Sequence, residues 1–117
     1  MLRSREDLIL AVLDNLGVTA EGQTPEAEDT AKVDGKMPAI LAELRALGIC
    51  YVDARDGVPF EMFSALADVV AAGCRAIYGV TGDEASALMQ ADAMARVTLK
   101  TINSGGPTYA LLVALSF

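Results

Sequence analysis

Three carboxylates spread along the chain are the residues best suited by type to acid–base chemistry. Glu21, Glu61 and Asp83 could supply the pair of carboxyl groups that cleaves a glycosidic bond. The sequence contains no histidine, so a serine or cysteine nucleophile lacks its usual general base. Nothing in the pattern gives the three carboxyls different environments, as an acid and a base would need. A small carboxylate-dependent hydrolase is therefore an alternative hypothesis, and we expect no enzyme.

A second acidic group lies in the first third of the chain. The net charge is −7. In this region the only basic residues that offset the acidic ones are Lys32 and Lys36. Their spacing lacks the alternating acids of a calcium loop, so we expect a solvated acidic face with no metal and no cofactor. An acidic regulatory module that binds one basic protein is a further alternative. The members of this acidic cluster are Glu26, Glu28, Asp29 and Asp34.

The net charge and the two cysteines also indicate which partners and which cellular compartment to expect. Binding DNA phosphates needs a clustered basic face, which this sequence lacks, whereas an acidic surface lets DNA pass without capture. Cys50 and Cys74 are interpreted as reduced, buried thiols of a protein made in the cytoplasm, and a disulfide would require their elements to face each other. Charges near the N-terminus argue against a signal peptide, and the longest charge-free apolar run, at the C-terminus, is about half as long as a membrane helix needs to be.

The segment 59–78 is the element around which the other helices must be arranged. On a helix its polar residues form one narrow stripe, and the remaining surface is apolar. Pro59 suits the first helical position, and Gly79 suits a left-handed stop. Several neighbours must cover this helix, either from the same chain or from other copies. The residues that need cover are Phe60, Phe63, Leu66, Val69, Val70, Cys74, Ile77 and Tyr78.

Three further helices are predicted from start signals and apolar periodicity. One begins after Ser4, with Asp7 in a capping box, and ends at Gly17. The second opens at Thr24-Pro25-Glu26 and continues to Gly48, with a kink or a break at Gly35 and Pro38. The third begins at Thr81, with Glu84 in a second capping box, and runs to about Ile102.

Few aromatic residues and many alanines, leucines and valines favour closely packed helices over a sheet. At 117 residues the chain is long enough for one domain. We expect an all-α fold, a bundle of about four helices over residues 1–106, with a short hairpin or loop near 49–58. Strand-forming residues at 49–52 and turn residues at 53–57 indicate that hairpin or loop.

The predicted helix at 81–102 carries apolar or small residues on two sides. Close contact is thus possible both with its own bundle and with a neighbouring subunit. Asp92 and Arg96 are spaced to form an ion pair along the helix. The candidate contacts with a neighbour are Ala87, Ala91, Met94, Asp92 and Arg96.

Residues 107–117 form a separate apolar segment behind a break at Asn103–Pro107. They could fold back on the bundle as a last strand or helical turn. They could also extend as an arm, since a lone strand of a helical domain would need a partner's strand or groove. The candidate interface residues of this arm are Tyr109, Leu111, Leu112, Val113, Leu115 and Phe117.

The order of these motifs resembles the head-to-tail adaptors of tailed phages, the connector or packaged-DNA-stabilising proteins beneath the portal. Residues 4–18 read Ser-x-x-Asp-Leu and then Leu-x-x-Leu-Gly-Val, and residues 44–49 read Leu-x-x-Leu-Gly-Ile. An acidic segment with proline lies between them. The resemblance covers roughly residues 4–103, and it continues through Phe63, Ala67, Ala71, Cys74 and the segment Lys100-Thr101-Ile102.

This resemblance implies a structural virion protein at the head–tail neck. Copies of a helical-bundle subunit would form a ring, by family analogy a dodecamer, that attaches to the portal protein and offers a surface to tail proteins. The ring would extend the channel, retain packaged DNA and let DNA pass without specific binding past the acidic cluster. We expect no membrane partner.

Overall fold

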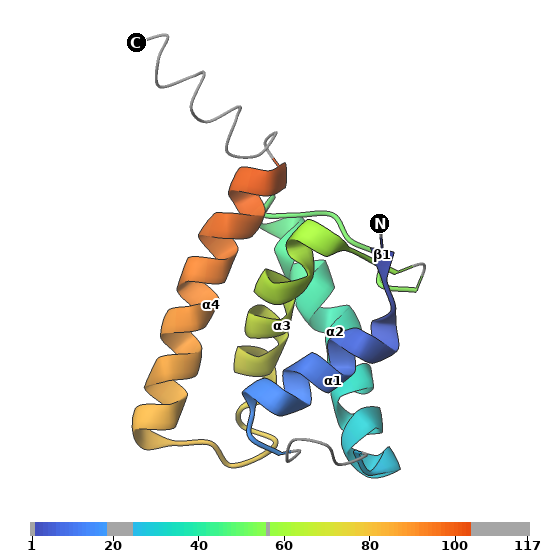
Figure 1. Cartoon of the computed structure of the whole chain (residues 1–117). Helices are drawn as coiled ribbons and strands as arrows, with labels where there is room; N and C mark the ends of the chain where they lie inside the picture. The colour runs from blue at the N-terminus through green and yellow to red at the C-terminus, as the bar shows by residue number, and fades with distance from the viewer. Residues whose placement is uncertain (1, 19–24, 56, 104–117) are drawn as a thin grey trace, which may run out of the picture.

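The computed structural model describes residues 2–18, 25–55 and 57–103 and is a bundle of four α-helices (Figure 1). The expected all-α fold with about four helices is therefore confirmed. The predicted arm at 107–117 lies outside the described residues. In chain order the elements are β1 (Leu2–Arg3), α1 (Arg5–Asn15), α2 (Ala27–Ala46), β2 (Val58–Pro59), α3 (Phe60–Cys74) and α4 (Gly82–Asn103).

Helix α1 begins and ends where its sequence signals predict. The Ser4 hydroxyl accepts a hydrogen bond from the Asp7 amide at 3.0 Å, which satisfies one of the free donors of the first turn. The helix ends before Gly17, whose φ of 73° is the left-handed conformation that favours glycine. Its buried face consists of Leu8, Ile9, Val12, Leu13 and Leu16.

Helix α2 starts later than predicted, and its middle decides between two predicted alternatives. It begins at Ala27 with Glu26 as the N-cap, so Pro25 precedes the helix and is not its first residue. The proposed cap, Thr24, lies outside the described residues. The helix continues through Gly35 and Pro38, so of the two predicted alternatives, a kink or a break, the break is excluded. A buried face on both sides of Pro38 holds the two halves together, formed by Val33, Met37, Ile40 and Leu44.

Arg5 supplies a physical reason why Pro38 is tolerated. Proline has no N–H, so the carbonyl of Asp34 loses the donor four residues ahead of it. In the structure, Arg5 Nη2 donates to this carbonyl at 3.3 Å, while Arg5 Nε donates to Asp34 Oδ1 at 2.6 Å. The arginine on α1 thus replaces the missing helical hydrogen bond and pairs with the acid of the same residue.

Replacing Arg5 with alanine should lower the free energy of unfolding by about 1–2 kcal/mol, because both hydrogen bonds are lost. In a Pro38→Ala background, the new alanine returns the N–H, so the same change at Arg5 should cost less, with a coupling of about 0.5 kcal/mol or more. Urea unfolding of the four proteins in this cycle measures the coupling. Equal costs of the Arg5 change in both backgrounds would contradict the replacement.

The segment between α2 and α3 is a loop, so the hairpin alternative is wrong and the loop alternative is correct. Most of its apolar residues are buried, and their burial fixes the path of the loop without strand pairing. Val58–Pro59 instead pairs antiparallel with Leu2–Arg3, near the start of the chain. The buried residues of the loop are Ile49, Cys50, Val52 and Ala54.

Helix α3 lies at the centre of the bundle, with α4 on one side and α1 and α2 on the other (Figure 1). Most of the residues expected to need cover are therefore shielded by their own chain, whereas Phe60 is 58% exposed. Pro59 is the N-cap, one residue before the first helical position predicted for it. The helix ends at Cys74, earlier than expected, and turns lead to Gly79, whose φ of 64° matches the predicted left-handed stop.

Both cysteines are free and buried in the hydrophobic core. Burial raises the pKa of the Cys50 thiol and the pKa of the Cys74 thiol, which disfavours the reactive thiolate. We expect neither thiol to react with Ellman's reagent in the folded protein, and both to react in denaturant. Rapid labelling of the native protein would contradict this arrangement.

Within the residues that the structure describes, no helix is both long enough and apolar enough to cross a membrane.

Candidate interaction surfaces

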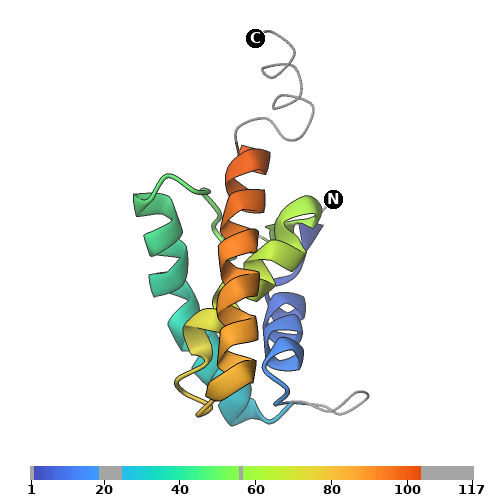
Figure 2. The ribbon, with the colours of Figure 1, turned by 90° about the vertical axis from the view of Figure 1, so that its left-hand side faces the viewer.

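Helix α4 covers α3 with one side and exposes the other (Figure 2). Ala95 and Leu99 are buried on the inner side, whereas the Met94 side chain is 70% exposed. We define the outer face of α4 as the exposed, uncharged residues that lie opposite the buried ones. These residues are Ser86, Ala87, Gln90, Ala93, Met94 and Val97.

The five predicted ring-contact residues of α4 do not share one environment. Ala87 and Met94 lie at the edge of the outer face toward α3, where Ala87 lines a hollow beside Asp68 and Met94 shares a shallow hollow with the half-buried Ala91. Asp92 and Arg96 form the predicted ion pair, with 3.0 Å between Arg96 Nε and Asp92 Oδ1. The outer face therefore carries two of the five predicted contacts.

Arg96 also joins α4 to α2. Its Nη2 lies 3.1 Å from Oε1 of Glu43, so one guanidinium binds two carboxylates. Burial alone would lower the pKa of Arg96, but hydrogen bonds and attraction to Asp92 and Glu43 outweigh burial and raise it. Asp92 and Arg96 are thus engaged within the subunit.

The acidic cluster predicted for a channel wall divides into two parts. Glu26, Glu28 and Asp29 occupy the N-cap and first turn of α2, where the helix dipole favours negative charge. Glu28 pairs with Lys32 at 3.3 Å. Asp34 lies farther along the helix and is neutralised by Arg5. In the part of the chain that the structure describes, no three acidic or cysteine side chains are grouped to hold a metal ion.

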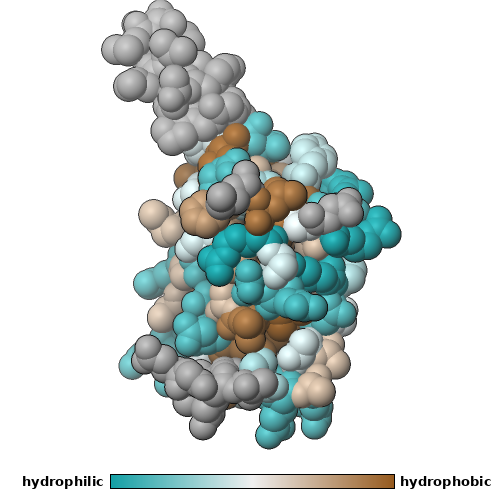
Figure 3. Space-filling view, turned by 45° about the vertical axis from the view of Figure 1, so that its right-hand side comes forward, coloured by the Kyte–Doolittle hydropathy of each residue, from teal (hydrophilic) through white to brown (hydrophobic). Residues whose placement is uncertain are grey.

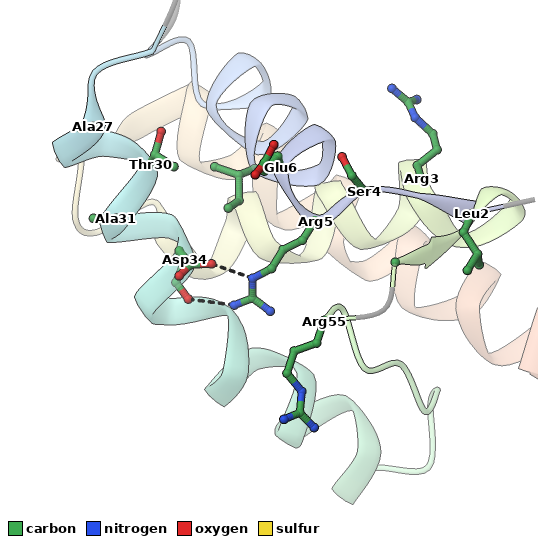
Figure 4. Close-up of a pocket in the computed structure, with 12 residues that line it drawn as sticks. Leu2, Arg3, Ser4, Arg5, Glu6, Ala27, Thr30, Ala31, Asp34 and Arg55 are labelled. Atoms are coloured by element: carbon green, nitrogen blue, oxygen red, sulfur yellow. Dashed lines mark hydrogen bonds and ion pairs between the residues drawn. The ribbon is translucent and has the colours of Figure 1, made fainter.

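An open pocket of about 850 Å³ lies between the start of α1, the first half of α2 and the loop before β2 (Figure 4). A smaller hollow of about 450 Å³ adjoins it and shares Arg5, Asp34 and Arg55. Sequence spacing does not indicate this pocket, because the residues that meet here come from distant parts of the chain. Arg5 pairs with Asp34, and Arg55 pairs with Asp53 at 2.8 Å, so both arginines are engaged within the subunit.

The structure does not bring two of the candidate hydrolytic carboxylates together. Glu61 lies in the first turn of α3 and Asp83 in the first turn of α4. The two helices run antiparallel, so these first turns lie at opposite ends of the pair (Figure 1). Glycosidic cleavage requires carboxyl groups within about 10 Å. The third candidate, Glu21, lies outside the described residues.

Asp68 lies in the polar stripe of α3 and faces α1. Its Oδ1 accepts a hydrogen bond from Asn15 Nδ2 at 3.2 Å, and burial raises the pKa of its carboxyl. Sequence spacing indicated a polar stripe but not this partner, which is 53 residues away. The hydrogen bond links α3 to the end of α1 and so helps to hold these two helices together.

Tyr78 connects the end of the α3 segment to the acidic start of α2. Its hydroxyl donates to the backbone carbonyl of Asp29 at 3.3 Å. Burial, followed by the negative charge of Asp29, raises the pKa of Tyr78 to about 12. This places a half-buried phenol next to the acidic cluster.

The stabilisation due to neutral Tyr78 should disappear in alkaline solution. Because its pKa is about 10 in the unfolded chain and about 12 in the folded one, the contribution is complete below pH 10. It is lost as the pH rises from about 10 to about 12. Denaturant unfolding should show a flatter pH dependence for Tyr78→Phe across this range. Tyr51→Phe, which changes an exposed ring, should keep the original slope.

On the side of α1 and α2, hydrophilic residues predominate and hydrophobic ones form separate patches (Figure 3). No family model matches the sequence, and comparisons with curated proteins and with solved structures find no match. Fold and surfaces together define a small acidic four-helix bundle with one exposed, uncharged helix face.

Proposed function

We propose that this chain is a structural virion protein, a head-to-tail adaptor whose copies form a ring below the portal. The observation that carries the proposal is the outer face of α4, which spans several helical turns without a charged residue. Its apolar members, Ala87, Ala93, Met94 and Val97, alternate with Ser86 and Gln90, and exposed apolar surface is typical of protein interfaces. The sequence resemblance to phage adaptors supports assigning this interface to contacts between subunits of a ring.

A ring requires two different surfaces of each subunit to meet around a closed rotation. In this proposal, the outer face of α4 supplies one surface through Ala87 and Met94. Arg96 keeps α4 fixed on the bundle through Glu43, which preserves the shape of the interface. The three acids at the start of α2, Glu26, Glu28 and Asp29, face the channel and repel the phosphates of passing DNA.

The arm residues 107–117 contact the portal protein or an adjacent subunit in the assembled neck, while the lower face of the ring receives tail proteins. This division assigns the apolar sequence of the arm to a partner and leaves the folded bundle independent of it. The twelve-fold number of the ring follows from the family analogy. The proposed site of action is the virion neck, reached after synthesis in the host cytoplasm.

The direct test mixes the purified chain with the portal protein of the same genome and images the complex by electron microscopy. We expect a ring of this protein on the portal. Deleting Thr108–Phe117 should abolish attachment while the bundle stays folded, because the four described helices share a hydrophobic core of their own. Normal attachment of the shortened chain would contradict the role of the arm.

The same preparations discriminate the alternatives. A one-to-one complex with a basic protein, and no ring, would indicate a regulatory module. Polysaccharide cleavage that is lost in Glu61→Gln or Asp83→Asn would indicate a hydrolase. Either result would contradict the adaptor role.

A further inference from the structure

Two shallow hollows adjoin each other over α3, on the side where α4 packs against it (Figure 1). The first, of about 450 Å³, lies between the end of α1, the start of α4 and Val80, and the second, of about 240 Å³, between α3 and the second half of α4. Asp68 lines both hollows, and we call them together the α3–α4 groove. Its lining residues on α4 extend from Glu84 to Thr98, a length of about 21 Å at about 1.5 Å per residue.

Small side chains form much of the groove surface. Ala65 of α3 and Ala95 of α4 are buried in it, and Ala87 and Ala91 line it as well. The distance between two packed helices depends on the side chains at their contact, so alanines allow a third helix to approach closely. The groove therefore suits a helical ligand of about four turns.

The charges of the groove all have one sign. Four carboxylates line it, those of Asp14, Glu61, Asp68 and Glu84, and neither hollow is lined by a lysine or an arginine. Within the described ranges of the chain, none of the four carboxylates takes part in an ion pair. This separates them from Asp34, Asp53 and the other acids that an arginine or lysine of the same chain neutralises. A cationic partner would find these four carboxylates available.

Asp68 is the carboxylate at the junction of the two hollows, and its surroundings point to a cationic partner. Its side chain is half-buried and accepts a hydrogen bond from the Asn15 amide, which is neutral. Burial raises the pKa of the Asp68 carboxyl, because the ionised form has lost part of its hydration. A lysine or arginine placed in the groove would stabilise this carboxylate through a charge-assisted hydrogen bond.

We propose that the α3–α4 groove binds an amphipathic helix of another protein, with small apolar residues facing the alanines and with lysines or arginines beside the four carboxylates. The length, the small side chains and the single sign of charge all fit this ligand. A second copy of the chain fits poorly, because each copy carries a net charge of −7 and two copies repel each other. The inference goes beyond the proposed adaptor function, since the partner is not another subunit of a ring.

The probe is a fluorescein-labelled helical peptide of 14 residues, with alanine and leucine on one face and lysine on the remainder. Fluorescence anisotropy with the full chain should show saturable binding that weakens as salt is added. Asp68→Asn keeps the oxygen that accepts from Asn15 and removes the charge, so it should weaken binding about tenfold. Glu61→Gln/Glu84→Gln, which changes two exposed residues, should weaken it about fivefold.

The matched control is Glu6→Gln/Glu28→Gln, which removes the same charge from exposed first-turn residues of α1 and α2 outside the groove. It should leave the affinity nearly unchanged. An equal loss in this control, or equal binding of a peptide with the same residues in scrambled order, would reduce the effect to general charge attraction and overturn the proposal. Absence of binding would overturn it too.

Sedimentation of the free chain tests the competing occupant. A dimer that dissociates in Glu61→Gln/Glu84→Gln would make a second copy the occupant and overturn the proposal, whereas a monomer supports it. No portal is present in these measurements, so their outcome and that of the adaptor test are independent.

Discussion

Replacing Leu66 with alanine is expected to lower the free energy of unfolding by about 2–5 kcal/mol. Leu66 lies on α3, is 0% exposed and belongs to the single core that all four helices share. Removing its side chain loses the burial of the deleted atoms and leaves a cavity that the neighbouring helices fill only in part. For a domain of this size, such a loss is a large fraction of the total stability.

Urea unfolding followed by circular dichroism measures this effect. The matched control is Leu47→Ala at the end of α2, where the side chain is 57% exposed and the cost should stay within about 0.5 kcal/mol. Similar losses for the two variants would show that α3 is not the centre of the packing.

The second large effect is expected for Met94→Glu, which should abolish ring assembly on the portal without lowering the melting temperature. Met94 is exposed in the isolated subunit, so the glutamate remains hydrated there. In a ring, the same carboxylate would be buried against an apolar neighbour without a partner, which costs several kcal/mol for each interface. The cost is repeated at every contact around the ring, so assembly should fail entirely.

Electron microscopy of portal mixed with the variant measures the outcome. Met94→Leu keeps the apolar volume and should assemble normally. Leu10→Glu places the same charge on an exposed leucine of α1, away from the outer face of α4, and should also permit rings. Intact rings with Met94→Glu would exclude the outer face of α4 as a subunit contact.

The fold class follows from local sequence signals, which placed α1 correctly but set the start of α2 and the end of α3 a few residues away from their observed positions. The Ser4 cap and the three- and four-residue spacing of the leucines define α1 without any help from the rest of the chain. The pair Asp92–Arg96 is equally local, since its two members are one helical turn apart. The apolar circumference of α3 likewise required a central position, which the bundle provides.

Only the tertiary structure decided what the local signals left open or indicated wrongly. A proline and a glycine in α2 suggested a kink or a break, yet burial on both sides of Pro38 and the hydrogen bond from Arg5 maintain the helix. The pairing of β1 with β2 joins segments more than fifty residues apart. No spacing rule predicts such pairs.

The candidate interaction surfaces were also predicted in part from the sequence and in part only from the structure. Residue types and helical spacing predicted that α4 has two apolar sides. They also made Ala87 and Met94 candidate contacts with a neighbouring subunit. The sequence could not reveal that Arg96 reaches Glu43 or that Asp34 is neutralised by Arg5. Helix periodicity is set by each residue's near neighbours and is therefore written in the sequence, whereas ion pairs between helices depend on how the helices pack. The sequence thus determined which helices form, and the packing decided which charges remain free at the surface.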